Sequence, residues 1–193
     1  MRIMIRRGLI ITFLLLINFG FSQEKNEVEK RVKKNEVPET ALEWLKDAYE
    51  KKRRTKWYFQ TDGEEEVFEA KLKHKRHLHS IEFNMRGVVQ NIEVLIKEKE
   101  IDEDVYEVIL SYLKETYTKY SLSKIQIQYT GQPDDLEDLI DENELENLKI
   151  SYEIEYYGKT ETKDELWEGL FDHSGRLLNK RIVKIKNTDN LDY

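Results

Sequence analysis

Three histidines lie close enough in the sequence to act together as metal ligands. His77 and His79 are two positions apart, so on a β-strand their side chains share one face, and His74 lies across the turn before them. A zinc site needs three or four ligands, often with thiolates, and the chain contains no cysteine. We therefore interpret the three as surface or edge histidines of a hairpin and predict no metal-ligating residues.

A second candidate for chemistry is an acidic insertion at residues 132–148. It contains no basic residue, and its carboxylates are Asp134, Asp135, Glu137, Asp138, Asp141, Glu142, Glu144 and Glu146. Calcium requires several oxygens folded around one point, and the best-known loop includes a glycine for its sharp turn. Because residues 134–146 contain no glycine, we interpret the insertion as a solvated segment whose leucines allow a short helix.

The sequence offers no recognisable catalytic constellation. It lacks a Gly-x-Ser-x-Gly elbow, a glycine-rich phosphate loop and a cysteine nucleophile. Carboxylates abound, but nothing in their spacing singles out an acid–base pair. We therefore predict that the protein is not an enzyme and that it carries no catalytic residue and no cofactor.

Hydrophobic periodicity indicates the elements that must position these side chains. A helix is predicted to begin at Val37-Pro38, and strands follow at about 57–60, 67–74, 77–83 and 88–96. A second helix is predicted to begin at Asp102, whose side chain can cap it. Strands follow it at about 125–129, 151–157 and 177–186, with another that ends at Phe171.

The two series of elements resemble each other. Phe83 and Gly87 recur as Phe171 and Gly175, and the offset between matching positions grows from 64 at the helices to 68, 84 and 88. Each step falls in a connection, which is typical of structural repeats. We predict an α+β fold, a tandem repeat of an α-β-β-β-β unit with helices packed on one face of antiparallel four-stranded sheets. The units are 37–99 and 100–186, the second with the insertion 132–148.

The first twenty-two residues have the pattern of a signal peptide. A basic start with Arg2, Arg6 and Arg7 precedes an apolar run that ends in small residues. We predict a signal peptide at 1–22, a charged linker at 23–36 and a tail at 187–193. After cleavage the protein has no membrane anchor, because no cysteine is present to carry a lipid. We expect a periplasmic or secreted protein.

Net charge excludes one class of partner. The chain carries a formal charge of −7, and removal of the three leader arginines makes this −7 − 3 = −10. An exported protein this acidic is a poor ligand for nucleic acid, so we predict none.

Protein recognition is then the function that the surface favours. The strand face opposite the helices mixes aromatic, amide and charged groups, as protein-binding surfaces do. We predict that this exposed face binds a protein through Tyr58, Lys71, Lys73, Glu82, Gln126, Gln128, Glu153, Glu155 and Tyr157. An ordinary solvated sheet face would have the same composition.

The chain resembles the PepSY-like family of exported bacterial proteins, which are also described as β-lactamase-inhibitor-like. The residues that carry the resemblance are Val37-Pro38-Glu39 with Ala41-Leu42, Trp57-Tyr58, Phe68-Glu69-Ala70-Lys71, Ser80-Ile81-Glu82-Phe83 with Gly87, Glu100-Ile101, Lys124-Ile125-Gln126 and Gln128-Tyr129-Thr130-Gly131. The resemblance covers about 37–185. It implies tandem units and a non-catalytic role in binding or inhibiting an enzyme or peptidase of the cell envelope. The alternative is a periplasmic protein that binds a small molecule or a cation, calcium or zinc.

Overall fold

A computed structural model describes residues 24–50 and 54–184 of the 193-residue chain, and its ten strands form one sheet. The strands are β1 (Glu24–Lys25), β2 (Glu27–Val32), β3 (Lys56–Asp62), β4 (Glu65–His74), β5 (His77–Phe83), β6 (Val89–Leu95), β7 (Lys119–Thr130), β8 (Lys149–Lys159), β9 (Asp164–Asp172) and β10 (Leu177–Val183). The helices are α1 (Glu39–Ala48), α2 (Glu103–Thr116) and α3 (Pro133–Asp141), with short 3-10 turns η1 (Lys34–Glu36) and η2 (Glu98–Glu100).

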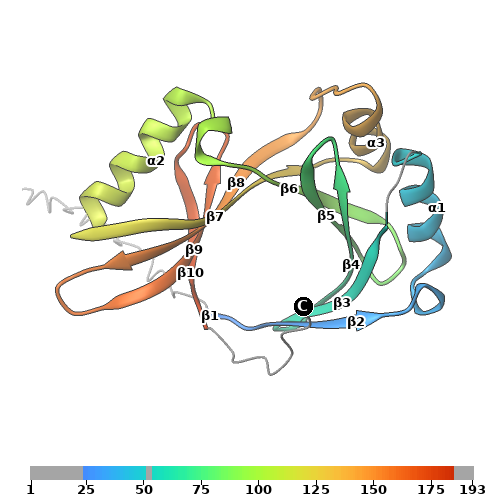
Figure 1. Ribbon diagram of the computed structural model, residues 1–193, viewed down its shortest axis with the longest axis horizontal. Helices are drawn as coiled ribbons and strands as arrows, with labels where there is room; N and C mark the ends of the chain where they lie inside the picture. Colours follow the sequence, from blue (N-terminus) through green and yellow to red (C-terminus); the bar gives the residue numbers. More distant parts are fainter. Residues whose placement is uncertain (1–23, 51–53, 185–193) are drawn as a thin grey trace, which may run out of the picture.

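The sheet curls into a nearly closed, barrel-like ring (Figure 1). Its strand order is β1-β10-β9-β8-β7-β6-β5-β4-β3-β2. β1 pairs with β10 in parallel, and β2 pairs with β3 antiparallel. The two edge strands of the sheet, β1 and β2, are therefore consecutive in the chain. Only Asn26 separates β1 from β2, and its backbone N–H donates to Asp62 Oδ1 at 3.0 Å. Residues 24–32 therefore act as a strap across the opening.

This ring corrects the predicted fold class. The chain does not form two four-stranded sheets, each with helices on one face, because β6 pairs with β7 through Asn91–Leu95 and Gln126–Thr130 and joins the strands into one sheet. Strand periodicity shows which side chains share a face but not which distant strands pair. The pairing of β6 with β7 was therefore not predicted.

The predicted linker at 23–36 also needs correction, because Glu24–Lys25 and Glu27–Val32 are strands. Charged side chains occupy both faces of β2, which hides the period of two that a strand normally shows. Backbone pairing with β3 and ion pairs hold β2, whereas of its residues Val32 alone packs against the apolar core. The predicted signal peptide at 1–22 and the tail at 187–193 lie outside the described residues.

Apolar side chains of the sheet point outward and are covered by the helices. In Figure 1, α2 lies outside the ring on one side, and α1 and α3 lie outside it on the other. Under α1, Leu72, Ile81 and Phe83 are buried, and under α2 so are Ile154 and Phe171; all five lie in strands where apolar and polar residues alternate. The alternation of apolar residues predicts these positions correctly.

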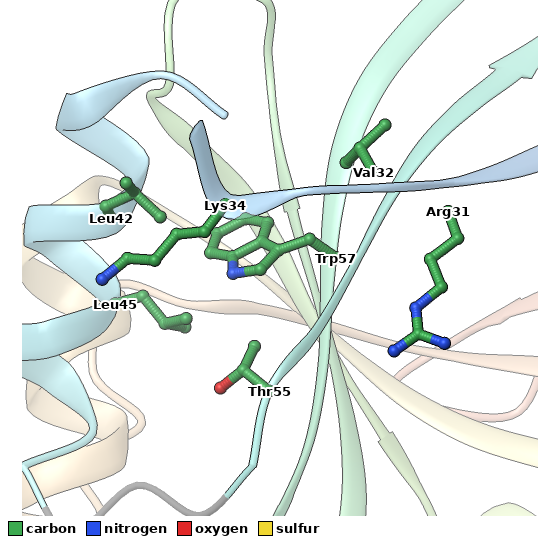
Figure 2. Close-up of a pocket in the computed structure, with 7 residues that line it drawn as sticks. All are labelled: Arg31, Val32, Lys34, Leu42, Leu45, Thr55 and Trp57. Carbon is green, nitrogen blue, oxygen red and sulfur yellow. The ribbon is translucent and has the colours of Figure 1, made fainter. Parts of the chain in front are cut away.

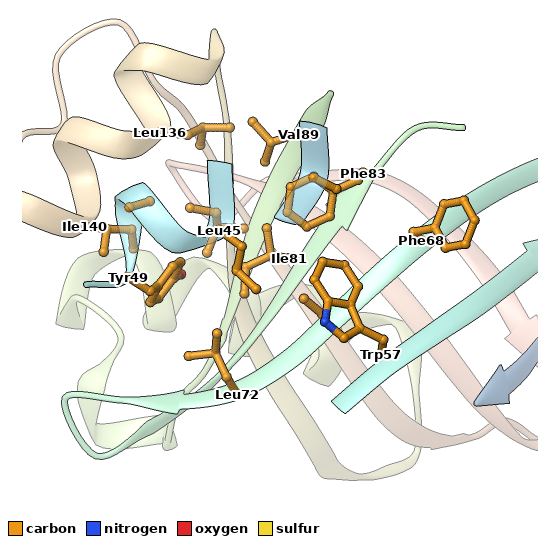
Figure 3. Close-up of a cluster of buried hydrophobic side chains, with 14 of the residues drawn as sticks. Leu45, Tyr49, Trp57, Phe68, Leu72, Ile81, Phe83, Val89, Leu136 and Ile140 are labelled. Atoms are coloured by element: carbon orange, nitrogen blue, oxygen red, sulfur yellow. The ribbon is translucent and has the colours of Figure 1, made fainter. Parts of the chain in front are cut away.

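The acidic insertion supplies α3, which completes the first core. Leu136, Leu139 and Ile140 belong to the same buried cluster as Leu45 of α1 and Tyr49, which directly follows α1. Figure 3 shows Leu136 and Ile140 beside these two residues. The indole N–H of Trp44 donates to the carbonyl of Pro133 at 3.2 Å, which fixes the start of α3 against α1. The connection between β7 and β8 thus covers strands from the other half of the chain.

The turns at Gly87 and Gly175 share one local structure. Both glycines have positive φ, +82° and +81°, and both lie against the first turn of a helix. A Cβ on Gly87 would lie 2.8 Å from the backbone nitrogen of Ala41, and one on Gly175 2.5 Å from the carbonyl oxygen of Val105. Only glycine fits such positions, because other residues would be both strained and too close.

Candidate functional site

The ring encloses a small cavity whose lining is entirely polar. Its volume is about 60 Å³. Its walls come from nine of the ten strands, and the residues, which we call the inner face, are Lys25, Glu27, Glu29, Gln60, Glu69, Lys71, Ser80, Glu82, Glu93, Lys124, Gln126, Glu153 and Arg181. The sequence produces this surface because the residues that alternate with the outward apolar ones are acids, bases and amides.

Hydrogen bonds across neighbouring strands order the centre of the inner face. Glu93 accepts from the amide nitrogens of Gln126 and Gln128, at 2.8 Å and 3.2 Å. The side-chain amide of Asn91 donates to Glu82 at 2.7 Å, and the Ser151 hydroxyl donates to the side-chain amide oxygen of Gln128 at 3.2 Å. These bonds fix the side chains of four adjacent strands in one arrangement.

Three glutamates of the inner face hold their protons unusually tightly. Burial, together with neighbouring carboxylates, raises the pKa of Glu82 and of Glu93 to about 7 and that of Glu153 to about 8. The side-chain amide oxygen of Gln126 is buried and has no hydrogen-bond partner among the described residues. A protonated carboxyl group can donate to such an acceptor, whereas an ionised one cannot. The cavity can therefore take up and release protons near neutral pH.

A network of charges closes the ring where the strap crosses it. Lys25 bonds to Glu27 at 2.8 Å and also to Glu168, and Arg181 bonds to Glu168 at 2.6 Å and also to Asp62. These pairs link β1, β2, β3, β9 and β10. Although burial opposes ionisation, the two cations hold the pKa of Glu168 below its usual value.

The structure places the predicted protein-binding residues on this inner side of the sheet. Only Lys73 and Tyr157 are exposed, Gln126 is buried, and the other six are half-buried. Lys71 lies over the ring of Tyr58 at 5.1 Å and pairs with Glu69 at 3.0 Å. The ring thus brings together residues that the sequence placed on one flat face.

Sequence reasoning missed several members of the inner face. Glu93 could have been found, because it alternates with Ile92 and Val94 in a strand that the sequence predicts. Lys25 and Glu27 were hidden in the segment interpreted as a linker. Arg181 and Glu168 approach them only because the sheet closes, which no local pattern reveals.

The histidines lie at the end of hairpin β4–β5, beneath α3. His79 is not a surface or edge residue, because β5 is paired on both sides and Tyr49 packs against the imidazole ring. It is buried, and its Nδ1 is 3.0 Å from the hydroxyl of Tyr49. Burial and the neighbouring cationic groups lower the pKa of His79 to about 3, so the ring is neutral. In the described part of the chain, no three His, Cys, Asp or Glu side chains are grouped so that they could hold a metal ion.

A second hollow, of about 310 Å³, lies between α1 and strands β2 and β3 (Figure 2). Trp57 lies at its centre, and Leu42 and Leu45 form its helix side. Figure 2 shows the stem of Lys34 extending over this apolar surface, whereas Arg31 lies farther from α1. The hollow is amphipathic, with an apolar base and a cation at its rim.

No protein-family model matches the chain, and no curated protein does. Similar solved structures exist. A DUF2874 family protein from Bacteroides ovatus is 15% identical, with a TM-score of 0.54 over 76% of this chain and 87% of that one. A candidate periplasmic protein from Bacteroides eggerthii is 12% identical, with a TM-score of 0.53 over 80% and 93%. A BLIP-like protein from Bacteroides fragilis is 13% identical, with a TM-score of 0.50 over 79% and 91%.

The fold of this chain is BLIP-like. Identities this low support the fold alone, so site residues cannot be transferred from these structures. None of the three is described as PepSY-like, and the tandem repeat that this resemblance implied is not the observed architecture. Among the described residues, no helix has the length and apolar composition that a membrane-spanning segment needs.

Proposed function

We propose that the protein is a non-catalytic, exported binding protein that recognises or inhibits an enzyme or peptidase of the cell envelope. The observation that carries this proposal is the BLIP-like fold, shared over most of the chain with a BLIP-like protein and with a candidate periplasmic protein. Export is further supported by the signal-peptide pattern of residues 1–22. A periplasmic or secreted location follows.

The binding surface that we propose is the predicted set of nine residues, of which the exposed members, Lys73 and Tyr157, make the first contact. Tyr157 is 45% exposed, and Tyr58 is half-buried under Lys71. Tyrosines held in this way lose little entropy on binding and supply both apolar area and a hydroxyl group. The ordered bonds behind them keep the surface in one shape, which lowers the cost of association.

Affinity capture from an envelope extract tests this proposal. The purified protein is used as bait, captured enzymes are identified by mass spectrometry, and their activity is measured with an excess of the protein. Tyr58→Ala/Tyr157→Ala should reduce capture of the same enzyme at least about tenfold, since buried aromatic anchors carry most binding energy. Val108→Ala, on the outside of α2, is the matched control and should leave capture unchanged.

Capture that is equal for wild type and the tyrosine variant would contradict the proposed surface. Capture only of proteins without enzymatic activity would contradict the proposed class of partner.

The hollow beside Trp57 favours a second candidate function, the binding of a small amphipathic anion. Its volume is at the lower end of the range of ligand pockets, and Lys34 supplies a charge at its rim. Titration with a medium-chain fatty acid should shift the indole N–H resonance of Trp57, and Lys34→Glu should abolish this shift. An unchanged resonance at saturating fatty acid would remove this candidate.

A further inference from the structure

A cationic groove lies where hairpin β4–β5 meets the segment after β6. Its volume is about 510 Å³, and it is lined by Lys73, Arg76, His77, Leu78, Leu95, Ile96, Lys97, Lys99 and Glu100. Leu78 is 54% exposed at this site. Such exposure of a leucine among four cations is unusual on a protein whose net charge is −7.

The cations of the groove have no internal partners that would explain them. None of Lys73, Arg76, Lys97 and Lys99 forms an ion pair with another described residue. Glu100 is paired at 3.5 Å with His77 instead. The groove therefore presents an apolar floor and unneutralised positive charge to solvent.

The chain contains a segment with the complementary chemistry. Residues 141–147 begin at the last residue of α3 and are all exposed. Their sequence is Asp-Glu-Asn-Glu-Leu-Glu-Asn, and we call this segment the acidic loop. Leu145 is 47% exposed and lies between Glu144 and Glu146. Within the described part of the chain, no carboxylate of the acidic loop forms an ion pair.

We propose that the cationic groove of one copy binds the acidic loop of a second copy. Leu145 would pack against Leu78, and the flanking glutamates would meet the lysines of the groove. The leucine of the groove is surrounded by positive charges and the leucine of the loop by negative ones. The contact therefore has an apolar centre and charge pairs around it that fix its orientation.

The position of the two surfaces favours a closed dimer. Both lie against hairpin β4–β5: Lys75 Nζ donates to the carbonyl of Ile140 at 3.2 Å, next to the acidic loop, and His77 lines the groove. His77 also lines a cavity shared with Asn143 of the acidic loop. A two-fold axis beside this hairpin makes the groove–loop contact twice, which is the commonest symmetry of soluble assemblies. Because each contact is small, the dimer should be weak.

Sedimentation velocity of the purified protein over a range of concentrations tests the proposal. Wild type should show a reversible dimer. Lys97→Glu/Lys99→Glu in the groove and Glu144→Lys/Glu146→Lys in the acidic loop should each weaken self-association at least about tenfold, because like charges then face each other. An equimolar mixture of the two variants should dimerise about as well as wild type, because both contacts are again between opposite charges.

Two controls keep the test specific. All four substituted side chains are exposed, so circular dichroism should show folded variants. Lys30→Glu/Lys34→Glu changes the net charge by the same amount as the groove variant, but on β2 and η1, away from the groove. It should dimerise like wild type.

A wild type that stays monomeric at every concentration would overturn the proposal. So would a loop variant that still dimerises, because another surface would then fill the groove, or a mixture that fails to restore the dimer. The assay contains no envelope enzyme and leaves Tyr58 and Tyr157 unchanged, so its failure is distinct from failure of the proposed function.

Discussion

At the scale of single residues, the inner-face glutamates have the chemistry that is hardest to read from the sequence. Glu82, Glu93 and Glu153 are ordinary strand acids in the sequence, among 39 acidic residues. Closure of the sheet removes them from solvent and raises the pKa of each to about 7 or 8. Their protonation therefore depends on a contact that forms only in the folded ring.

The raised pKa values predict that stability falls as pH rises. In the unfolded chain a glutamate has a pKa of about 4.3, so above about pH 6.5 it is ionised there, while Glu93 in the fold still holds its proton. The folded state binds more protons, and the free energy of unfolding should decrease up to about pH 9. His79 opposes this trend below about pH 7.5, because it is neutral in the fold but binds a proton in the unfolded chain as the pH falls towards the ordinary histidine pKa of about 6.5. Urea denaturation at a series of pH values measures the effect.

Glu93→Gln is the informative variant, because it mimics the protonated acid. Its free energy of unfolding should decline less between pH 6.5 and about pH 9 than that of wild type. If the two curves stay parallel over this range, Glu93 is ionised in the folded ring and the assignment is wrong.

The bond between Tyr49 and His79 gives a second residue-scale prediction. Tyr49 is 1% exposed, and its hydroxyl lies 3.0 Å from His79 Nδ1. Tyr49→Phe keeps the ring but leaves a buried nitrogen unpaired, so it should cost about 1–3 kcal/mol of unfolding free energy. Thermal and urea denaturation measure this, with Tyr157→Phe on the exposed rim as a control that should be neutral.

At the scale of elements, local signals in the sequence were reliable and compositional ones were not. Asp102 caps α2 by accepting from the backbone of Asp104, as the pattern of that helix start predicts. Strand β5 spans His77–Phe83 in both the prediction and the structure. The acidic insertion looked solvated because of its charge, yet three apolar residues at helical spacing bury α3 against α1.

The burial of α3 predicts that the insertion is a structural element. Leu136 is fully buried, so Leu136→Ala should leave a cavity and cost about 2–5 kcal/mol. Leu145→Ala, in the same insertion but exposed, should change stability by less than about 0.5 kcal/mol. Urea denaturation of dilute protein compares the two, and equal effects would mean that α3 does not pack as described.

At the scale of the whole molecule, the closure of the ring is what the sequence could not reveal. The apolar alternation correctly predicts which strand faces meet the helices, because that depends on neighbours along the chain. Periodicity predicts strands β6 and β7 but not that they pair with each other, and the strap of β1 and β2 lies in a segment without apolar periodicity. Backbone hydrogen bonds and electrostatic contacts, which leave no periodic pattern in the sequence, determine both the pairing of β6 with β7 and the position of the strap.

Closure of the ring should therefore depend on the charges beneath the strap. Glu168 is 4% exposed, and Lys25 and Arg181 are its two cationic partners. Lys25→Met/Arg181→Met leaves this carboxylate buried without a counter-charge, which should cost about 3–5 kcal/mol. Lys159→Met breaks an exposed pair with Asp164 and should cost about 0–1 kcal/mol.

Hydrogen exchange distinguishes opening of the ring from general destabilisation. In the double variant, amides of β1, β2 and β10 should lose protection first, because these strands border the seam, while β5 to β8 should keep theirs. Uniform loss of protection across the sheet would show that the seam opens only when the whole molecule unfolds. In that case the strap belongs to the cooperative core, and the ring has no separate closing step.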